Sequence, residues 1–216
     1  MMQWMMGHGV PWLAVAALMV LQSAVRIRVG GVSLLTWQQE RLGSNYVSPL
    51  AHFLTVLGLL LIGTFRATRL GITWGHWTPA PLVVFGLTLV VFPMTIVMSN
   101  YRAARDWRPR LPGWSLTLCV GLFAPIGEEL FWRGYLVPAV GLWGSAVAFG
   151  VVHAFNPGSV GQRAGNVIYA GVLGLIFGYL RLETGGIIAG IILHSVVNNI
   201  NHLTSGSTTD AAAKAS

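Results

Sequence analysis

Two adjacent glutamates, Glu128 and Glu129, lie in a long apolar stretch that runs from Leu116 to Leu136, and Arg133 follows them in the same stretch. A carboxylate at the centre of a bilayer costs about 2.5 to 3.5 kcal/mol even on the mildest scales. Glu129 and Arg133 have the i, i+4 spacing that places two side chains on one helix face, whereas Glu128 is turned ~100° away. The cost of burying these charges indicates that they serve a chemical or a structural purpose.

Two further polar or aromatic pairs have the same i, i+4 spacing, namely Phe149 with His153 and His194 with Asn198. If these segments are helices of one bundle, the paired side chains can meet the glutamates in one polar pocket. Such a pocket suits hydrolysis, because a glutamate can take a proton from water and later return it to a leaving amine. The imidazoles can act as acids or orient water, and the Asn198 amide can hydrogen-bond an oxyanion.

The composition indicates which kind of structure holds these residues in place. Of 216 residues, 54% are hydrophobic and 9% are charged, whereas a soluble domain carries roughly 25% charged residues. Apolar runs of about 20 residues recur along the chain and predict a polytopic helical membrane protein. We expect an all-α bundle of about seven spans with the catalytic core in the last four. The expected spans lie near Val10–Val25, Val47–Phe65, Pro81–Met98, Trp114–Leu136, Ala139–Phe155, Asn166–Leu180 and Gly186–Leu203.

Charge and chain organisation favour a membrane partner over a nucleic acid. The formal net charge is +7, but nearly all basic residues are arginines in short segments between apolar runs, where topology signals lie. We expect N-terminal spans and a cytoplasmic Arg-rich linker in residues 1–112, a catalytic core in 113–203 and a disordered tail in 204–216. In the sixth span, Gly174 and Gly178 form a small-xxx-small pair that permits close helix packing.

Alternative uses of the same residues remain open. Glu129 and Arg133 can form a purely structural ion pair, and a buried histidine is more often hydrogen-bonded core than catalyst. Zinc is a second possibility, because Glu128, His153 and His194 would form a known type of catalytic ligand set. Against zinc, the sequence has no HExxH helix, and the ligands would converge from three separate helices. From the residues alone, zinc stays open. Cys119 is the only cysteine, which excludes an intrachain disulfide and a multi-cysteine metal site.

Three motifs carry a family resemblance. Glu128-Glu129-Leu-Phe-Trp-Arg133 matches EExxxR, Phe149-Gly-Val-Val-His153 matches FxxxH, and His194-Ser-Val-Val-Asn198 matches HxxxN. Each motif alone is weak, but the three in this order within hydrophobic spans are specific. From about Trp114 to Leu203, the chain resembles the CAAX protease and bacteriocin-processing family (CPBP or Abi family), which includes the prenyl-protein Ras-converting endopeptidase.

The resemblance implies an intramembrane endopeptidase that cuts a membrane-associated protein or peptide, in a bacterial cytoplasmic membrane and without a metal. In this family pattern, Glu128 would activate the water and His153 would help to hold it, while His194 and Asn198 would line the site or the oxyanion hole. Supporting positions would be Glu129, Arg133 and Phe149.

Two other function classes fit a polar cluster in a membrane protein. The first is a non-enzymatic immunity or partner-binding protein, in which the cluster only holds the bundle together. The second is a proton- or ion-coupled transporter, which also uses buried carboxylates. The transporter ranks last, because no inverted repeat is visible and the first half of the chain has no matching polar pair.

Overall fold

The computed structural model describes residues 2–24, 28–29, 32–33, 47–61, 67–103, 117–155 and 159–204. In these ranges the regular structure is helical, apart from an antiparallel pair of two-residue strands, β1 (Arg28–Val29) and β2 (Val32–Ser33). The predicted all-α class is therefore confirmed. Most of the predicted Arg-rich linker and nearly all of the predicted disordered tail lie outside the described residues.

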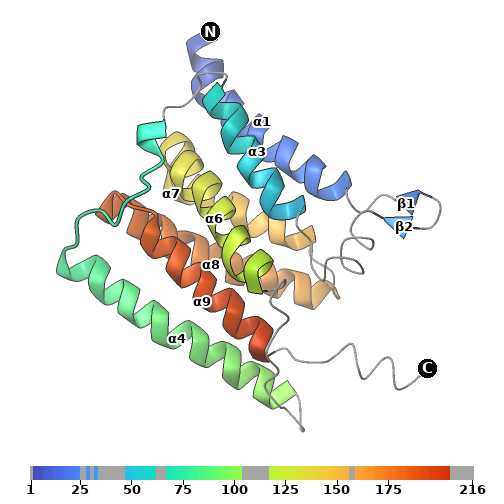
Figure 1. Cartoon of the computed structure of the whole chain (residues 1–216), viewed down its shortest axis with the longest axis vertical. Coiled ribbons are helices and arrows are strands. Elements are labelled where there is room, and N and C mark those ends of the chain that lie inside the picture. Colours follow the sequence, from blue (N-terminus) through green and yellow to red (C-terminus); the bar gives the residue numbers. More distant parts are fainter. Residues whose placement is uncertain are drawn as a thin grey trace.

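The helices form a bundle in which the two outer pairs lie on opposite sides (Figure 1). Helix α1 (Met2–Ala24) packs against α3 (Val47–Leu61) on one side, and α4 (Pro79–Ala103) packs against α9 (Ile188–Thr204) on the other. Helix α6 (Ala124–Glu129) contacts both α3 and α9. The segment that carries the two glutamates therefore lies between the amino-terminal and carboxyl-terminal parts of the chain.

The remaining helices continue from this central segment. Helix α6 lies between two π-helices, and α7 packs along α8 and also contacts α1. Their bounds, with those of two short 3-10 turns, are η1 (Ala67–Arg69), η2 (Cys119–Phe123), η3 (Leu130–Leu136), α7 (Val137–Val152), η4 (His153–Phe155) and α8 (Val160–Thr184). The wide turns of a π-helix are rare and are often found at functional sites.

Three helical segments within the described ranges are long and apolar enough to cross a membrane, and they are Pro79–Met98, Cys119–Phe155 and Val160–Thr184. Two shorter apolar helices cover Gly9–Val20 and Pro49–Leu61. The chain is therefore an integral membrane protein, whereas the count of about seven spans stays a prediction.

The segment Cys119–Phe155 is a helical hairpin, because it contains a sharp turn at Gly141, whose φ is 80° and ψ is 172°. A residue without Cβ adopts this conformation at little steric cost. Beyond the turn, the Ser145 hydroxyl donates to the Trp132 carbonyl oxygen at 2.8 Å, which joins the two arms. The expected break between the fourth and fifth spans, at Leu136–Ala139, was placed too early. Pro138 did not end the helix because proline is tolerated in the first turn of α7.

Glycines allow α7 and α8 to pack closely. A Cβ on Gly174 would lie 3.1 Å from the Ala146 Cα, and a Cβ on Gly178 would lie 2.5 Å from the Leu142 Cδ1. A larger residue at position 174 would press on the Ala146 backbone, whereas at position 178 it would first displace the end of the Leu142 side chain. The packing role predicted for this small-xxx-small pair is confirmed.

Two apolar clusters fill the bundle and meet at the motif residues. One cluster contains Phe131, Trp132 and Phe149, with side chains of α1 and α3. The other contains Phe177 with side chains of α8 and α9, and residues of α4 pack against it. The motif residues lie where these two clusters meet, because the Arg133 guanidinium carbon is 4.2 Å from the centroid of Phe149 and 5.2 Å from that of Phe177.

Candidate active site

Glu129 is the centre of a buried ion-pair network. Its Oε1 lies 3.1 Å from Nη1 of Arg133 and accepts a hydrogen bond from Nδ1 of His194 at 3.0 Å. The side chains of Glu129 and Arg133 are 0% and 1% exposed. The Phe149 and Phe177 rings flank the guanidinium and stabilise its charge through cation–π attraction. Because a buried charge is tolerated only when it is compensated, this network explains how the bundle accommodates Glu129.

Glu128 occupies a different environment from its neighbour, although the two are adjacent in sequence. Its side chain is 16% exposed, and its Oε2 lies 3.7 Å from Nε2 of His194. That separation is an ion-pair contact but is too long for a hydrogen bond. The imidazole of His194 thus bridges the glutamates, donating to Glu129 and facing Glu128. Of the two glutamate side chains, only that of Glu128 has exposed surface, although its Oε2 is buried.

The helix that carries the glutamates is held to α9 by two asparagines. In an α-helix the Ala124 N–H would donate to the Val120 carbonyl oxygen, but in the π-helix η2 it donates to the Cys119 carbonyl oxygen. The Val120 oxygen therefore lacks this donor. Pro125 has no N–H, so the Gly121 oxygen loses its usual helical donor. Asn198 Nδ2 donates to the Val120 oxygen at 3.0 Å, and Asn199 Nδ2 donates to the Gly121 oxygen at 3.2 Å.

His153 lies at the end of α7, where the helix tightens into the 3-10 turn η4. Its Nδ1 is 2.7 Å from the Phe149 carbonyl oxygen, and the two rings are in edge contact with centroids 4.7 Å apart. A carbonyl oxygen can only accept, so Nδ1 carries the proton and Nε2 of the neutral ring is an acceptor. This arrangement fixes the tautomer and leaves Nε2 able to hold a water molecule through one of its protons.

Six of the seven residues singled out from the sequence gather at this place. Glu129, Arg133 and His194 are in direct contact, Phe149 covers the arginine, and Glu128 faces His194. His153 packs on Phe149 and interacts electrostatically with Glu128. Asn198 lies one helical turn beyond His194, with its amide nitrogen bonded to Val120. The roles proposed for these residues stay predictions, but their proximity is a feature of the structure.

Motif reasoning did not identify several contributors to the site. Phe177 contacts both Arg133 and His194, and Asn199 holds the second carbonyl of the π-helix. Gly190 leaves room for Glu129, because a Cβ there would lie 2.8 Å from Glu129 Oε2. His52 of α3 is 2% exposed and interacts electrostatically with Glu128. Their contacts with the site join different helices, so the asparagine doublet Asn198-Asn199 is the one signal in the sequence that could have indicated them.

No group of three or more His, Cys, Asp or Glu side chains is placed to hold a metal ion, within the residues that the structure describes. The zinc alternative, with Glu128, His153 and His194 as ligands, and the expectation of no cofactor both stay predictions.

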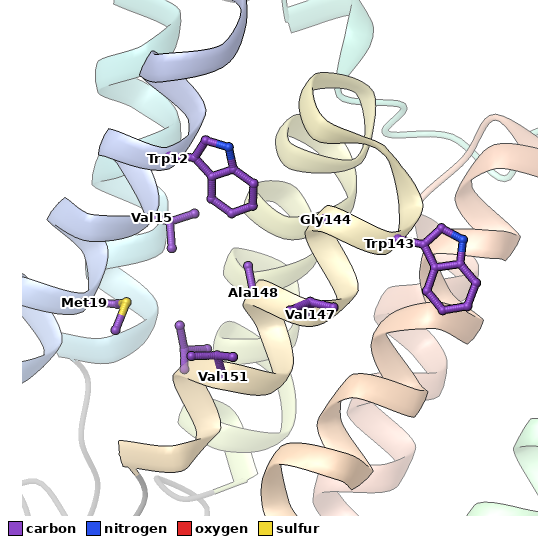
Figure 2. A pocket seen from close by; sticks show the side chains of 9 residues that line it. Trp12, Val15, Met19, Trp143, Gly144, Val147, Ala148 and Val151 are labelled. Carbon is purple, nitrogen blue, oxygen red and sulfur yellow. The ribbon is translucent and has the colours of Figure 1, made fainter.

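Two grooves lie beside the cluster. An apolar groove of about 470 Å³ runs between α1 and α7, and Figure 2 shows Trp12, Val15 and Met19 facing Ala148 and Val151 across it. Its lining ends at Val152, the residue before His153. A second, more polar groove of about 360 Å³ lies between α4, α8 and α9. It is lined by Thr95, Ile96, Asn166, Tyr169, Val197, Asn198 and Asn201.

One family model matches part of the chain. Residues 110–200 match the family model described as type II CAAX prenyl endopeptidase Rce1-like. The matched segment contains the EExxxR, FxxxH and HxxxN motifs, and the match confirms the resemblance to CAAX proteases seen in the sequence. No curated protein and no solved structure matches the chain.

Proposed function

We propose that this chain, a CAAX protease relative over residues 110–200, is an intramembrane endopeptidase of a bacterial cytoplasmic membrane. It would hydrolyse a peptide bond of a membrane-associated protein or peptide with a glutamate-activated water. The observation that carries the proposal is the asymmetry of the glutamate pair. Glu129 is fully buried, forms an ion pair with Arg133 and accepts a hydrogen bond from His194, whereas Glu128 is 16% exposed and faces an imidazole.

The geometry supports a general base role for Glu128. Its carboxylate would take a proton from a water molecule whose other proton is hydrogen-bonded to Nε2 of His153, and the resulting hydroxide would attack the carbonyl carbon of the substrate. The tetrahedral intermediate would then collapse as the C–N bond breaks. Glu128 would return its proton to the leaving amine, which leaves the glutamate ionised for the next cycle.

Asn198 would stabilise the oxyanion of the intermediate. A carboxamide has two N–H donors, and one of those of Asn198 is bonded to the Val120 oxygen. That bond fixes the orientation of the amide group, so the second N–H can be aimed at the oxyanion before the reaction begins. Pre-oriented donors of this kind stabilise developing charge more than mobile ones do.

Glu129 and Arg133 would act as a scaffold and not as reacting groups. The carboxylate of Glu129 accepts the Nδ1 proton of His194, which fixes how the imidazole is turned toward Glu128. Arg133 neutralises Glu129 at 3.1 Å and is itself enclosed by two aromatic rings. The scaffold keeps a second negative charge from acting unscreened on Glu128.

The grooves support a substrate that is partly embedded in the bilayer. The apolar α1–α7 groove is lined by Val152, the neighbour of His153 in sequence, and can take an apolar segment of the substrate. The groove between α4, α8 and α9 presents carboxamides and includes Asn198, so a peptide backbone can be hydrogen-bonded along it.

The test compares the peptides of membranes from cells that produce either the parent chain or Glu128→Gln. A glutamine keeps the shape of the side chain but cannot take a proton at neutral pH. We expect at least one peptide that appears only with the parent, at matched protein levels. Identical peptide profiles in the two membranes, or cleavage by purified Glu128→Gln at the parent's rate, would contradict the proposal.

A second candidate is a non-enzymatic membrane protein that binds a partner. The bonds from Asn198 and Asn199 to the π-helix favour this reading, because they are also what a purely structural cluster would need. In that case, loss of the phenotype on Glu128→Ala or His153→Ala would follow the amount of protein in the membrane. A phenotype lost at normal protein level would exclude it.

A further inference from the structure

His52 brings a polar side chain from the amino-terminal part of the chain into the apolar interior. It lies on α3, is 2% exposed, and is flanked in sequence by Ala51 and Phe53. Burying an imidazole costs free energy unless its nitrogens find partners. A phenylalanine or leucine would fill this volume without that cost, so the choice of histidine calls for an explanation.

The backbones of α3 and α6 approach closely at the position of His52. A Cβ added to Gly127 would lie 3.1 Å from the Pro49 carbonyl oxygen and 3.2 Å from the His52 Cβ. Gly127 directly precedes Glu128, so its missing side chain allows α3 to pack against the start of the motif. The imidazole of His52 also packs on the two aromatic residues of that motif, with ring centroids 6.0 Å from Phe131 and 6.4 Å from Trp132.

Electrostatics connect the same imidazole to the proposed base. The imidazoles of His194, His52 and His153 and the guanidinium of Arg133 all interact electrostatically with the Glu128 carboxylate. His52 is thus one of three imidazoles whose charge would act on that carboxylate. It lies outside the segment that matches the family model, residues 110–200.

We propose that His52 is a positioning residue for Glu128. The imidazole from α3 and that of His194 from α9 hold the carboxylate between them and orient it toward the water that it deprotonates. This inference rests on the proposed function of Glu128 as base. It also extends the catalytic unit, because α3 then contributes to the reaction and not only to the scaffold.

The test compares His52→Phe with His52→Gln in the purified full chain. Phenylalanine keeps the ring contacts to Phe131 and Trp132 but has no N–H, whereas glutamine keeps a donor and loses the ring. If His52 positions Glu128, kcat falls roughly 10- to 100-fold in His52→Phe, as for a misplaced reacting group, with KM and thermal stability unchanged. His52→Gln then recovers a large part of kcat despite its poorer packing.

A structural role predicts the opposite ranking. His52→Phe would then cleave like the parent, or kcat would fall in both variants in step with their melting temperatures. Either result would overturn the proposal. If His52→Phe does not insert or fold, the comparison of kcat with melting temperature in His52→Gln decides alone, because a positioning role predicts nearly normal kcat in spite of a lower melting temperature.

A second measurement separates this inference from the proposed function, because it needs no substrate. Dicyclohexylcarbodiimide attacks protonated carboxyl groups inside membranes, so its rate of attachment reports how often Glu128 carries a proton. Loss of an imidazole donor should make attachment roughly two- to tenfold faster in His52→Phe, with Glu128→Gln as the blank. If His52→Phe is labelled faster than the parent but the parent cleaves nothing, the protease assignment is contradicted and the His52–Glu128 interaction is supported. Labelling of His52→Phe at the parent's rate would contradict the His52–Glu128 interaction.

Discussion

The substitution Gly190→Ala tests how tightly Glu129 is confined. An added Cβ at this position would lie 2.8 Å from Glu129 Oε2 and 3.4 Å from its Cδ, closer than Cβ atoms approach oxygen in proteins. Glu129 cannot turn away freely, since its Oε1 is bound by Arg133 and His194. Either the carboxylate leaves those partners or α9 moves outward.

The expected cost follows from these contacts. Overpacking a filled interior costs about 1–3 kcal/mol, and each kcal/mol lowers the melting temperature of a chain of this size by about 2–4 °C. We therefore expect Gly190→Ala to melt roughly 2–12 °C below the parent. Cleavage should slow as well, because a 1 Å displacement near the reacting groups can reduce the rate by about 100-fold.

Cys119 provides the assay. It is the only cysteine and is 0% exposed, so a thiol-reactive dye labels it only when the fold opens on heating. The matched control is Gly165→Ala on α8, where an added Cβ meets nothing within 4 Å. That change should be neutral or stabilise by up to about 1 kcal/mol, through helix propensity. If Gly190→Ala has the same melting temperature as the Gly165→Ala control, the confinement of Glu129 is refuted.

Three other predictions follow from the same contacts. Asn198→Ala and Asn199→Ala each remove the side-chain donor to one carbonyl of the π-helix, so each variant should lose about 1–3 kcal/mol of stability. Only Asn198→Ala should also lower kcat, by about 10²–10³-fold. Equal losses of kcat in the two variants would contradict the oxyanion role of Asn198. Arg133→Met should lower the free energy of unfolding by about 3–5 kcal/mol, because it leaves the buried charge of Glu129 unpaired. The double variant with Glu129→Gln should recover part of this stability, measured by Cys119 labelling on heating. No recovery would mean that the ion pair contributes nothing. Arg181→Met removes the bonds to the Arg69 and Gly185 oxygens, so the melting temperature should fall while kcat is unchanged; a loss of kcat would connect this distant contact to the site.

Local spacing predicted the parts of the site that depend on one helix. Glu129 and Arg133 were placed on one face by their i, i+4 spacing, and the structure places their charged atoms 3.1 Å apart. The all-α class and the packing role of Gly174 and Gly178 were visible for the same reason, since composition and helical periodicity are properties of short segments.

The features that sequence reasoning missed depend on contacts between distant segments. His52 lies beside Gly127, the residue before Glu128, only because α3 packs against α6, and nothing near His52 in the sequence indicates this. The periodicity also gives no sign of the π-helix η3, because an apolar run looks alike at either helical pitch. The ~100° turn between neighbouring residues separates the two glutamates, but which of them faces the solvent depends on α9, through His194 and Gly190.

The decisive measurement compares purified Glu128→Gln with purified Glu129→Gln. Cleavage of one peptide and melting with a Cys119-reactive dye are measured for both, to test whether Glu128 is the base and Glu129 the scaffold. We expect that Glu128→Gln melts like the parent and cuts nothing, whereas Glu129→Gln melts at a lower temperature and retains measurable cleavage. Cleavage by Glu128→Gln, or loss of cleavage confined to Glu129→Gln, would contradict this expectation.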